Sequence, residues 1–305
     1  MIVMTCLRAR ILAPVAALPL LLVGCSAASD DGEVQIAVTA YPLQFIAERV
    51  AGEAATVTNV APAGTEPHDL ELSPSAVTSI VTSDVVLMLS GFQAAVDDTI
   101  GEVGEETVVV DAADSADLLE EGHEDEGDHD GHDHSGVDPH FWLDPLRVAD
   151  VADALAAALT ETDPDGAATY EANAASLRTD LETLESEFAT GLADCADRTF
   201  VTSHEAFGYL ADAFELTQIG IGGIDPEAEP SPARVAEVLR EARDAGVTTI
   251  FTQPGGLTAG ADAVAEELGL TLATLDPIEL EPQGSDYLAA MRANLAALHE
   301  GLQCS

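Results

Sequence analysis

Three histidines that lie far apart in the sequence could together hold one metal ion. His68, His140 and His204 each directly follow a Pro or Ser in a short polar run, and a fourth run contains Asp276 and Glu279. Three neutral imidazoles and one carboxylate oxygen suit a closed tetrahedral zinc site. A single His in such a run is more often a loop or capping residue than a ligand, so the prediction depends on the fold bringing the four runs together.

A second group of histidines lies in one low-complexity segment. From 123 to 134, four of the eight histidines of the chain alternate with Asp, Glu and Gly. The segment has no apolar residue and no periodicity, so we expect disorder over about residues 120–137. Imidazoles and carboxylates that are free to wrap around an ion predict a weak accessory metal site, and a merely solvated loop is the alternative. The four imidazoles are those of His123, His129, His132 and His134.

Short β-rich runs alternate with helical runs in both halves of the chain, which predicts parallel sheets wrapped by helices. The predicted strands are 34–39, 55–60, 85–89 and 107–110, then 199–202, 217–221, 247–252 and 271–275. Helices are predicted at 42–51 and 74–82 and from about residues 205, 232, 258 and 285 onward. Each candidate ligand run follows a predicted strand, and doubly wound sheets bind ligands beyond the carboxyl ends of their strands. The predicted fold class is therefore α/β, with two doubly wound parallel-sheet domains that each contribute two of the candidate ligand runs.

One long helix is predicted between the two halves. Asp163 and Pro164 provide an N-cap and a first-turn proline, and apolar residues recur every three or four positions as far as Leu192. A helix over 164–194 would be a rigid rod of about 45 Å, at about 1.5 Å per residue. Such a connection favours small domain movements over wide closure. The predicted domains are 34–145, a helical connection at 146–194, and 195–305.

The first 25 residues have the features of a secretory signal. Arg8 and Arg10 precede the apolar stretch 11–23, which is too short for a typical transmembrane span. The stretch ends in a Leu-Val-Gly-Cys run that resembles a bacterial lipobox, so Cys25 is the predicted lipidation site and 26–33 a flexible tether. An ordinary signal peptide is the alternative. We expect the protein on the outer face of the cell membrane or in the periplasm.

Cys195 and Cys304 are the cysteines that remain beyond the signal and Cys25. An even pair in an oxidising compartment predicts a disulfide. It would close a loop of over a hundred residues and contribute about 4–5 kcal/mol through chain entropy. A soft metal site is the alternative, although no Cys or His partner lies nearby in the sequence.

The net charge of the chain is strongly negative. Ten Lys and Arg against 56 Asp and Glu give −46. So acidic a surface repels phosphate backbones, which argues against nucleic-acid binding. It attracts cations and favours solubility, although an acidic composition suited to a salty habitat accounts for most of the charge.

The motifs together resemble the zinc/manganese solute-binding proteins of bacterial ABC importers, a family that includes adhesin-type lipoproteins. The resemblance covers nearly all of the mature chain. It rests on Glu-Pro-His at 66–68, Asp-Pro-His-Phe-Trp-Leu-Asp-Pro at 138–145, Ser-His at 203–204, Ala-Phe-Gly-Tyr at 206–209 and Glu-Pro-Ser-Pro at 229–232. It implies a metal held in the interdomain cleft, with His68, His140 and His204 as ligands.

Members of this family usually take a protein-derived fourth ligand from an acidic residue after the last strand. Asp276 and Glu279 both stand there, and we favour Glu279, with Asp276 supporting the site or capping. A water molecule with Glu66 nearby is a further alternative. Gln253 stands where relatives often carry Glu, and we expect it not to contact the metal.

The resemblance implies an extracytoplasmic protein that captures Zn²⁺ and delivers it to the permease and ATPase subunits of an ABC importer. His204, where manganese-type relatives often have Glu, and the His-rich segment favour Zn²⁺ over Mn²⁺. We expect a monomer held at the membrane by its lipid, and no enzyme. The alternatives are a manganese-binding or adhesin-type relative and a zinc hydrolase with Glu205 as its base, but the sequence has no His-Glu-x-x-His motif.

Overall fold

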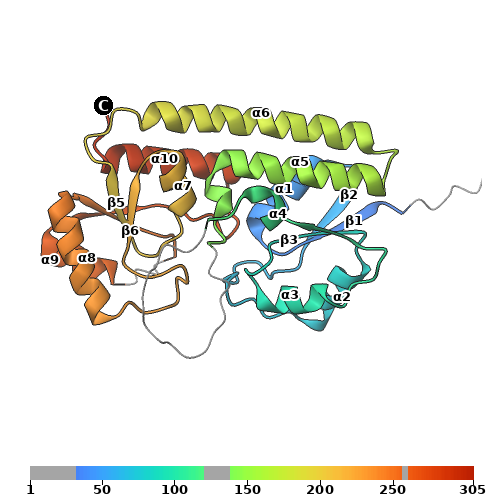
Figure 1. Cartoon of the computed structure of the whole chain (residues 1–305), viewed down its shortest axis with the longest axis horizontal. Coiled ribbons are helices and arrows are strands. Elements are labelled where there is room, and N and C mark those ends of the chain that lie inside the picture. Colours follow the sequence, from blue (N-terminus) through green and yellow to red (C-terminus); the bar gives the residue numbers. More distant parts are fainter. Residues whose placement is uncertain (1–31, 120–137, 256–259) are drawn as a thin grey trace, which may run out of the picture. The chain divides into compact units, whose positions relative to one another are not determined.

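Two four-stranded sheets, parallel throughout, form the framework of this computed structural model (Figure 1). The structure describes residues 32–119, 138–255 and 260–305, and Glu33–Ser305 form one compact unit. The strand orders are β2-β1-β3-β4 and β6-β5-β7-β8. The strands are β1 Val34–Val38, β2 Ala55–Asn59, β3 Val85–Met88, β4 Val108–Asp111, β5 Thr199–Thr202, β6 Thr217–Gly220, β7 Thr249–Thr252 and β8 Thr271–Thr274. The predicted α/β class with two doubly wound parallel sheets is confirmed.

Helices cover both faces of each sheet (Figure 1). In the N-terminal lobe, defined as β1–β4 with α1–α4, one face is covered by α1 and α5 and the other by α2 and α3. In the C-terminal lobe, defined as β5–β8 with α7–α10, α8 and α9 cover one face and α10 the other. The helices are α1 Tyr41–Ala51, α2 Pro74–Thr82, α3 Ala94–Ile100, α4 Ala113–Ala116, the 3₁₀ helix η1 Phe141–Leu143, α5 Pro145–Thr162, α6 Ala167–Gly191, α7 Gly208–Ala213, α8 Pro232–Ala245, α9 Ala261–Leu268 and α10 Tyr287–Gly301.

Alternate residues of the central strands are buried on opposite faces, as expected for a parallel sheet covered on both sides. In β1, Ile36 and Val38 belong to the core beside α1 and α5, whereas Ala37 belongs to a smaller core beneath α2 and α3. In β5, Phe200 and Val201 divide in the same way between the two faces of the second sheet. The carboxyl ends of the central strands are therefore fixed in place by packing on both sides.

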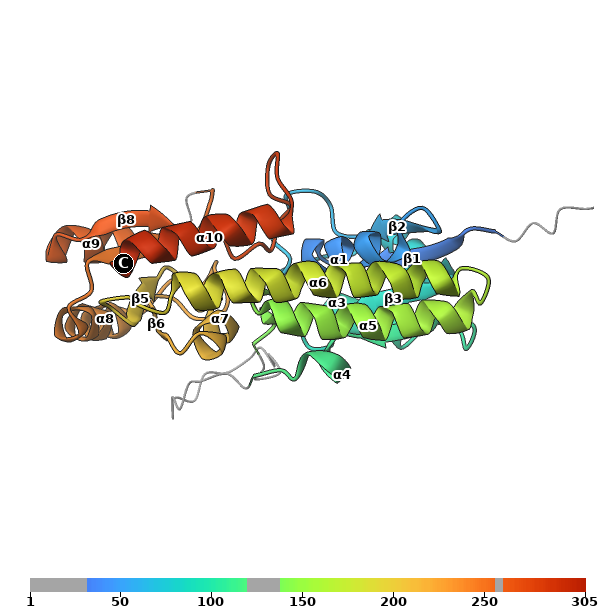
Figure 2. The same ribbon diagram turned by 90° about the horizontal axis from the view of Figure 1, so that it is seen from above.

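The connection between the lobes consists of two helices rather than one. The predicted helix over 164–194 is shorter, since α6 begins at Ala167, and α5 packs along it (Figure 2). The predicted N-cap, Asp163, instead closes α5, because its N–H donates to the Leu159 carbonyl. Its carboxylate accepts a hydrogen bond from the Tyr170 hydroxyl. The apolar stripe of α6 packs against α1 and α5 at one end and α10 at the other.

The main hydrophobic core is continuous through both lobes and this helical connection. It includes Trp142 of η1, Leu177 of α6, Phe200 of β5 and Tyr287 of α10. The predicted disulfide between Cys195 and Cys304 is present and ties the end of the chain to the segment before β5. Both features join the last helix firmly to the rest of the protein.

Several predictions concern residues outside the described ranges. They are the signal and tether at 1–33, apart from its last two residues, the lipidation site Cys25, and the acidic segment with His123, His129, His132 and His134. Within the described ranges, no helix has the length and apolar character that would let it cross a membrane.

Candidate metal centre

His68 lies in the loop that leads from β2 to α2. Its backbone N–H donates to the Glu66 carboxylate at 3.2 Å. The preceding carbonyl, of Pro67, accepts a hydrogen bond from the buried Gln93 side chain, which also donates to the carbonyl of Thr39. Gln93 therefore ties the His68 loop to the carboxyl end of β1, a link that sequence patterns do not reveal.

His140 lies immediately before η1 and is completely buried. Its backbone N–H and its Nδ1 lie 2.9 Å and 2.7 Å from the same carboxylate oxygen of Asp138. A ring nitrogen that donates to a carboxylate has its tautomer and orientation fixed, which leaves Nε2 as the ligating atom. Asp138 therefore orients the His140 ring. In the sequence it stood out only as the first residue of the run 138–145.

His204 lies two residues after the end of β5 and is nearly fully buried. Its carbonyl accepts hydrogen bonds from the Thr202 hydroxyl at 2.6 Å and the Gln218 amide at 3.1 Å. The helix predicted from about residue 205 begins only at Gly208, and the Glu205 N–H donates to the Gly223 carbonyl.

The Glu279 side chain is held by a tight loop between β8 and α10. The buried Asn294 amide donates to the Asp276 carbonyl and accepts from the Asp276 N–H. The Asp276 carboxylate accepts from the Ile278 N–H at 2.8 Å, and Ile278 has a φ of 57°. A branched residue in this left-handed region is strained and persists only when its surroundings fix it. Asp276 thus shapes the loop that presents Glu279.

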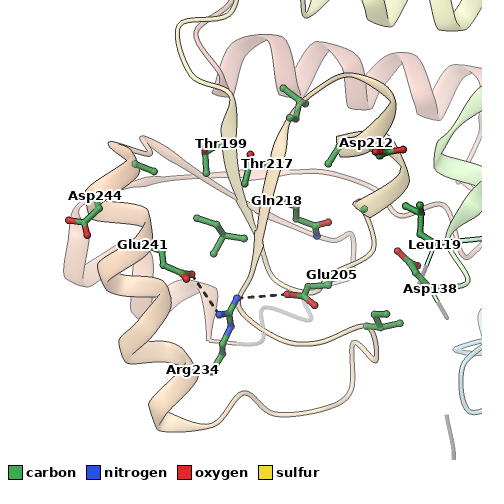
Figure 3. A pocket seen from close by; sticks show the side chains of 16 residues that line it. Leu119, Asp138, Thr199, Glu205, Asp212, Thr217, Gln218, Arg234, Glu241 and Asp244 are labelled. Carbon is green, nitrogen blue, oxygen red and sulfur yellow. Dashed lines mark ion pairs between the residues drawn. The ribbon is translucent and has the colours of Figure 1, made fainter. Parts of the chain in front are cut away.

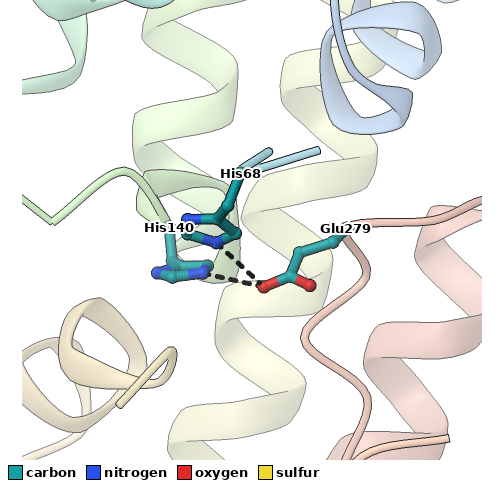
Figure 4. A group of neighbouring side chains, drawn as sticks. All are labelled: His68, His140 and Glu279. Atoms are coloured by element: carbon teal, nitrogen blue, oxygen red, sulfur yellow. Dashed lines mark hydrogen bonds and ion pairs between the residues drawn. The ribbon is translucent and has the colours of Figure 1, made fainter. Parts of the chain in front are cut away.

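The Nε2 atoms of the three histidines converge on one oxygen of Glu279. Glu279 Oε1 lies 2.9 Å from His140, 3.3 Å from His204 and 3.5 Å from His68. The ligand atoms of His68, His140 and Glu279 all lie within 4.8 Å of one another (Figure 4). His204 lies outside that mutual group, although its ring centroid is 5.7 Å from that of His140. The buried His68 Nε2 has no hydrogen-bond partner among the described residues.

Burial and paired charges act against each other in this cluster. Burial lowers the pKa of His140, but Asp138 and Glu279 outweigh it and raise this pKa to about 9. Burial lowers the pKa of His204. Burial would raise the pKa of Glu279, yet hydrogen bonds with the imidazoles lower it well below its usual value. Near neutral pH these shifts favour an ionised Glu279 beside a protonated His140 and a neutral His204.

A cavity of about 590 Å³ opens next to Glu279 and is lined by further carboxylates. Glu66, Glu227, Asp276 and Glu281 all line it, together with Gln253. Burial, then the charge of Glu279, raises the pKa of Glu66 to about 7. Its acidic lining would attract a cation to the side of the cluster on which Glu279 lies.

A larger cavity, of about 910 Å³, is lined mostly by residues of the C-terminal lobe, together with Leu119 and Asp138 (Figure 3). None of the three histidines lines it. Arg234 is ion-paired there with Glu205 at 3.8 Å and with Glu241 at 3.7 Å. The Glu205 carboxylate, which follows His204 in the sequence, therefore faces an arginine and not the imidazole cluster. Glu205, the residue considered as the base of a zinc hydrolase, is therefore not placed to act on an ion in the cluster.

Comparison with known proteins places the chain among metal-uptake components. The family model described as zinc-uptake complex component A, periplasmic (ZnuA), matches residues 36–301. The chain is 34% identical over 292 residues to the zinc-binding lipoprotein AdcA of Streptococcus pneumoniae, covering 92% of this chain and 58% of that relative. It is 31% identical over 287 residues to the high-affinity zinc uptake system protein ZnuA of Bacillus subtilis, covering 91% of this chain and 90% of the relative. The chain thus spans little more than half the length of the AdcA relatives.

Solved structures share the same fold. The laminin-binding protein Lbp of Streptococcus pyogenes superposes with a TM-score of 0.76 at 30% identity, covering 88% of this chain and 99% of that one. Zn(II)-bound AdcA from Streptococcus pneumoniae superposes with a TM-score of 0.75 at 31% identity, covering 89% of this chain and 58% of that one.

Proposed function

The chain belongs to the family of periplasmic zinc-uptake components, and on that basis we propose that it captures Zn²⁺ outside the cytoplasmic membrane and passes it to an ABC importer. Zinc is the cargo of this site, and His68, His140, His204 and Glu279 are its proposed ligands. The single observation that carries the proposal is the convergence of three imidazole nitrogens on one carboxylate oxygen.

The spacing of these atoms suits a tetrahedral ion. Zn–N and Zn–O bonds of about 2.0 Å place neighbouring ligand atoms of a tetrahedron about 3.3 Å apart. The distances from Glu279 Oε1 to the three Nε2 atoms run from 2.9 to 3.5 Å, which brackets that value. The imidazole of His204 needs the largest adjustment, because it lies outside the group formed by His68, His140 and Glu279.

The donor set favours zinc over harder divalent ions. Three imidazole nitrogens and one carboxylate oxygen suit Zn²⁺, whereas Mn²⁺ prefers more oxygen ligands. Cu²⁺ would bind such a site more tightly in vitro, so the choice in the cell depends also on metal availability. The four protein ligands leave no open coordination position, and catalytic zinc requires one. We therefore propose a binding protein and not an enzyme.

The sequence and the relatives support delivery to an importer and anchoring by lipid. AdcA of Streptococcus pneumoniae is named a zinc-binding lipoprotein, and the run ending at Cys25 resembles a lipobox. We propose that Cys25 is lipidated and holds the folded domain at the outer face of the cell membrane. There the protein would work as a monomer beside the permease and ATPase subunits of its importer. The His-rich segment that includes His123 and His134 is proposed to bind metal weakly as an accessory.

Zinc titration against a competing chelator tests this function. The wild-type protein should bind one Zn²⁺ tightly, and His68→Ala, His140→Ala and His204→Ala should each remove most of that affinity. His299→Ala, on the exposed face of α10, is the matched control and should bind as the wild type does. Full zinc affinity in the triple variant of His68, His140 and His204 would overturn the assignment.

A further inference from the structure

Trp142, the one tryptophan of the chain, lies in η1, two residues after His140, and is 1% exposed. Its ring centroid is 5.3 Å from that of His140 and 5.8 Å from that of Phe92. Phe92 in turn meets His68 edge-on, with centroids 4.9 Å apart. One aromatic wall therefore supports two of the imidazoles from the N-terminal lobe.

The polar atoms of Trp142 reach the other lobe. The indole N–H donates to the Pro277 carbonyl at 2.8 Å, and Pro277 lies two residues before Glu279. The Trp142 carbonyl accepts from the Tyr287 hydroxyl at 2.6 Å, at the start of α10. Trp142 thus contacts the His140 imidazole with its ring and the loop that carries Glu279 with its indole nitrogen.

We propose that Trp142 is a positioning residue that sets the Glu279 loop against the imidazoles and thereby raises zinc affinity. The inference rests on the proposed function, because it concerns how the same four ligands are held. It adds a residue that does not itself touch the ion, and it names the atom through which that residue acts.

The Glu279 loop needs support from outside itself. It has no regular secondary structure, and Ile278 next to Glu279 has the strained φ of 57°. Asn294 holds the loop from α10 at Asp276, and the indole holds it from the opposite lobe at Pro277. Without the indole N–H, the buried Pro277 carbonyl would lose its donor, and a buried acceptor without a partner favours rearrangement of its loop.

Trp142→Phe removes this hydrogen bond together with part of the buried ring, while phenylalanine keeps an aromatic ring beside Phe92 and His140. Zinc affinity, measured by competition with a chelator, should fall about tenfold, the effect expected for one buried hydrogen bond. Tyr170→Phe is the matched control: it removes a tyrosine hydroxyl bond to Asp163 far from the ligands and should leave zinc affinity unchanged.

A double-mutant cycle separates positioning from general destabilisation. In a Glu279→Gln background, Trp142→Phe should change zinc affinity less than about twofold, because its effect acts through the carboxylate already replaced. An equal loss in both backgrounds, or no loss in the Trp142→Phe single variant, would refute the proposal. Zinc binding by the wild type is measured first. If the wild type binds no zinc, the proposed function fails; if it binds zinc, the double-mutant cycle tests the role of Trp142 alone.

The wild-type protein offers a measurement that needs no variant of Trp142. A single tryptophan gives a single indole N–H cross-peak in a ¹H–¹⁵N spectrum, so its assignment is unambiguous. Its exchange with solvent should be slow, and zinc should shift the peak by much less in Glu279→Gln than in the wild type. Exchange at the rate of an exposed indole in the zinc-loaded wild type would show that the bond to Pro277 is not made.

Discussion

His140 should make the stability of the metal-free protein fall as the solution becomes more alkaline. Burial lowers its pKa, but Asp138 at 2.7 Å and Glu279 at 2.9 Å raise it from 6.5 to about 9. Because the folded-state pKa is the higher one, the stabilisation is fully present below pH 6.5 and is lost as the pH rises through 9. The rise of the His140 pKa from 6.5 to about 9 corresponds to about 3 kcal/mol of unfolding free energy, which is lost between about pH 6 and about pH 9.5.

Urea unfolding with a chelator present, followed by far-ultraviolet circular dichroism, measures this effect. The wild type is compared at each pH with His140→Gln, because Glu66 and Glu185 also have raised pKa values, each about 7, from burial first. The difference in unfolding free energy between the two proteins should shrink by about 3 kcal/mol across that range. His299→Gln should show no such trend. A difference that is independent of pH, or that grows with pH, would refute the charged state assigned to His140.

Three further variants test the disulfide and the fourth ligand. Replacing Cys195 and Cys304 together by Ser should lower the unfolding free energy by about 4–5 kcal/mol, since the bridge spans 109 residues, and an unchanged urea midpoint would contradict this. Glu279→Gln should lower zinc affinity at least about tenfold, whereas Asp276→Asn should change it only a few-fold, because the Asp276 carboxylate accepts from Ile278 within the loop. The reverse order of these two effects, measured by chelator competition, would assign the ligand to Asp276.

The sequence predicted the sheets well because their signal is local. Runs rich in β-branched residues and bounded by turns marked the strands. Burial on both faces keeps the central strand β3 apolar throughout, whereas the edge strands β2, β6 and β8 carry exposed polar residues. The pairing of Cys195 with Cys304 could be predicted by elimination. Helix boundaries were less reliable: the predicted helix from about residue 205 begins at Gly208, and Asp163 ends α5 rather than beginning α6. The Glu205 N–H bonds to the Gly223 carbonyl of another segment, whereas the Asp163 N–H completes α5 by donating to the Leu159 carbonyl.

The histidines could be predicted as a group because each follows a strand, and strand ends meet at one edge of a sheet. What surrounds them could not be predicted, since it depends on pairs distant in the sequence. The Trp142 indole reaches Pro277 across 135 residues, and the Gln93 amide reaches Thr39 across 54. Nothing in a local pattern indicates such partners. Asp276 illustrates the limit: its residue type suits a metal ligand, but the structure engages its carboxylate with the backbone of its own loop.

The central claim is that one Zn²⁺ is held jointly by the two lobes. Crystals of the protein purified without added metal, with data collected on both sides of the zinc absorption edge, test it most directly. One anomalous peak within about 2.0–2.2 Å of the Nε2 atoms of His68, His140 and His204 and of a Glu279 oxygen is the predicted result. A zinc peak bound elsewhere, with these four side chains uncoordinated, would contradict the account.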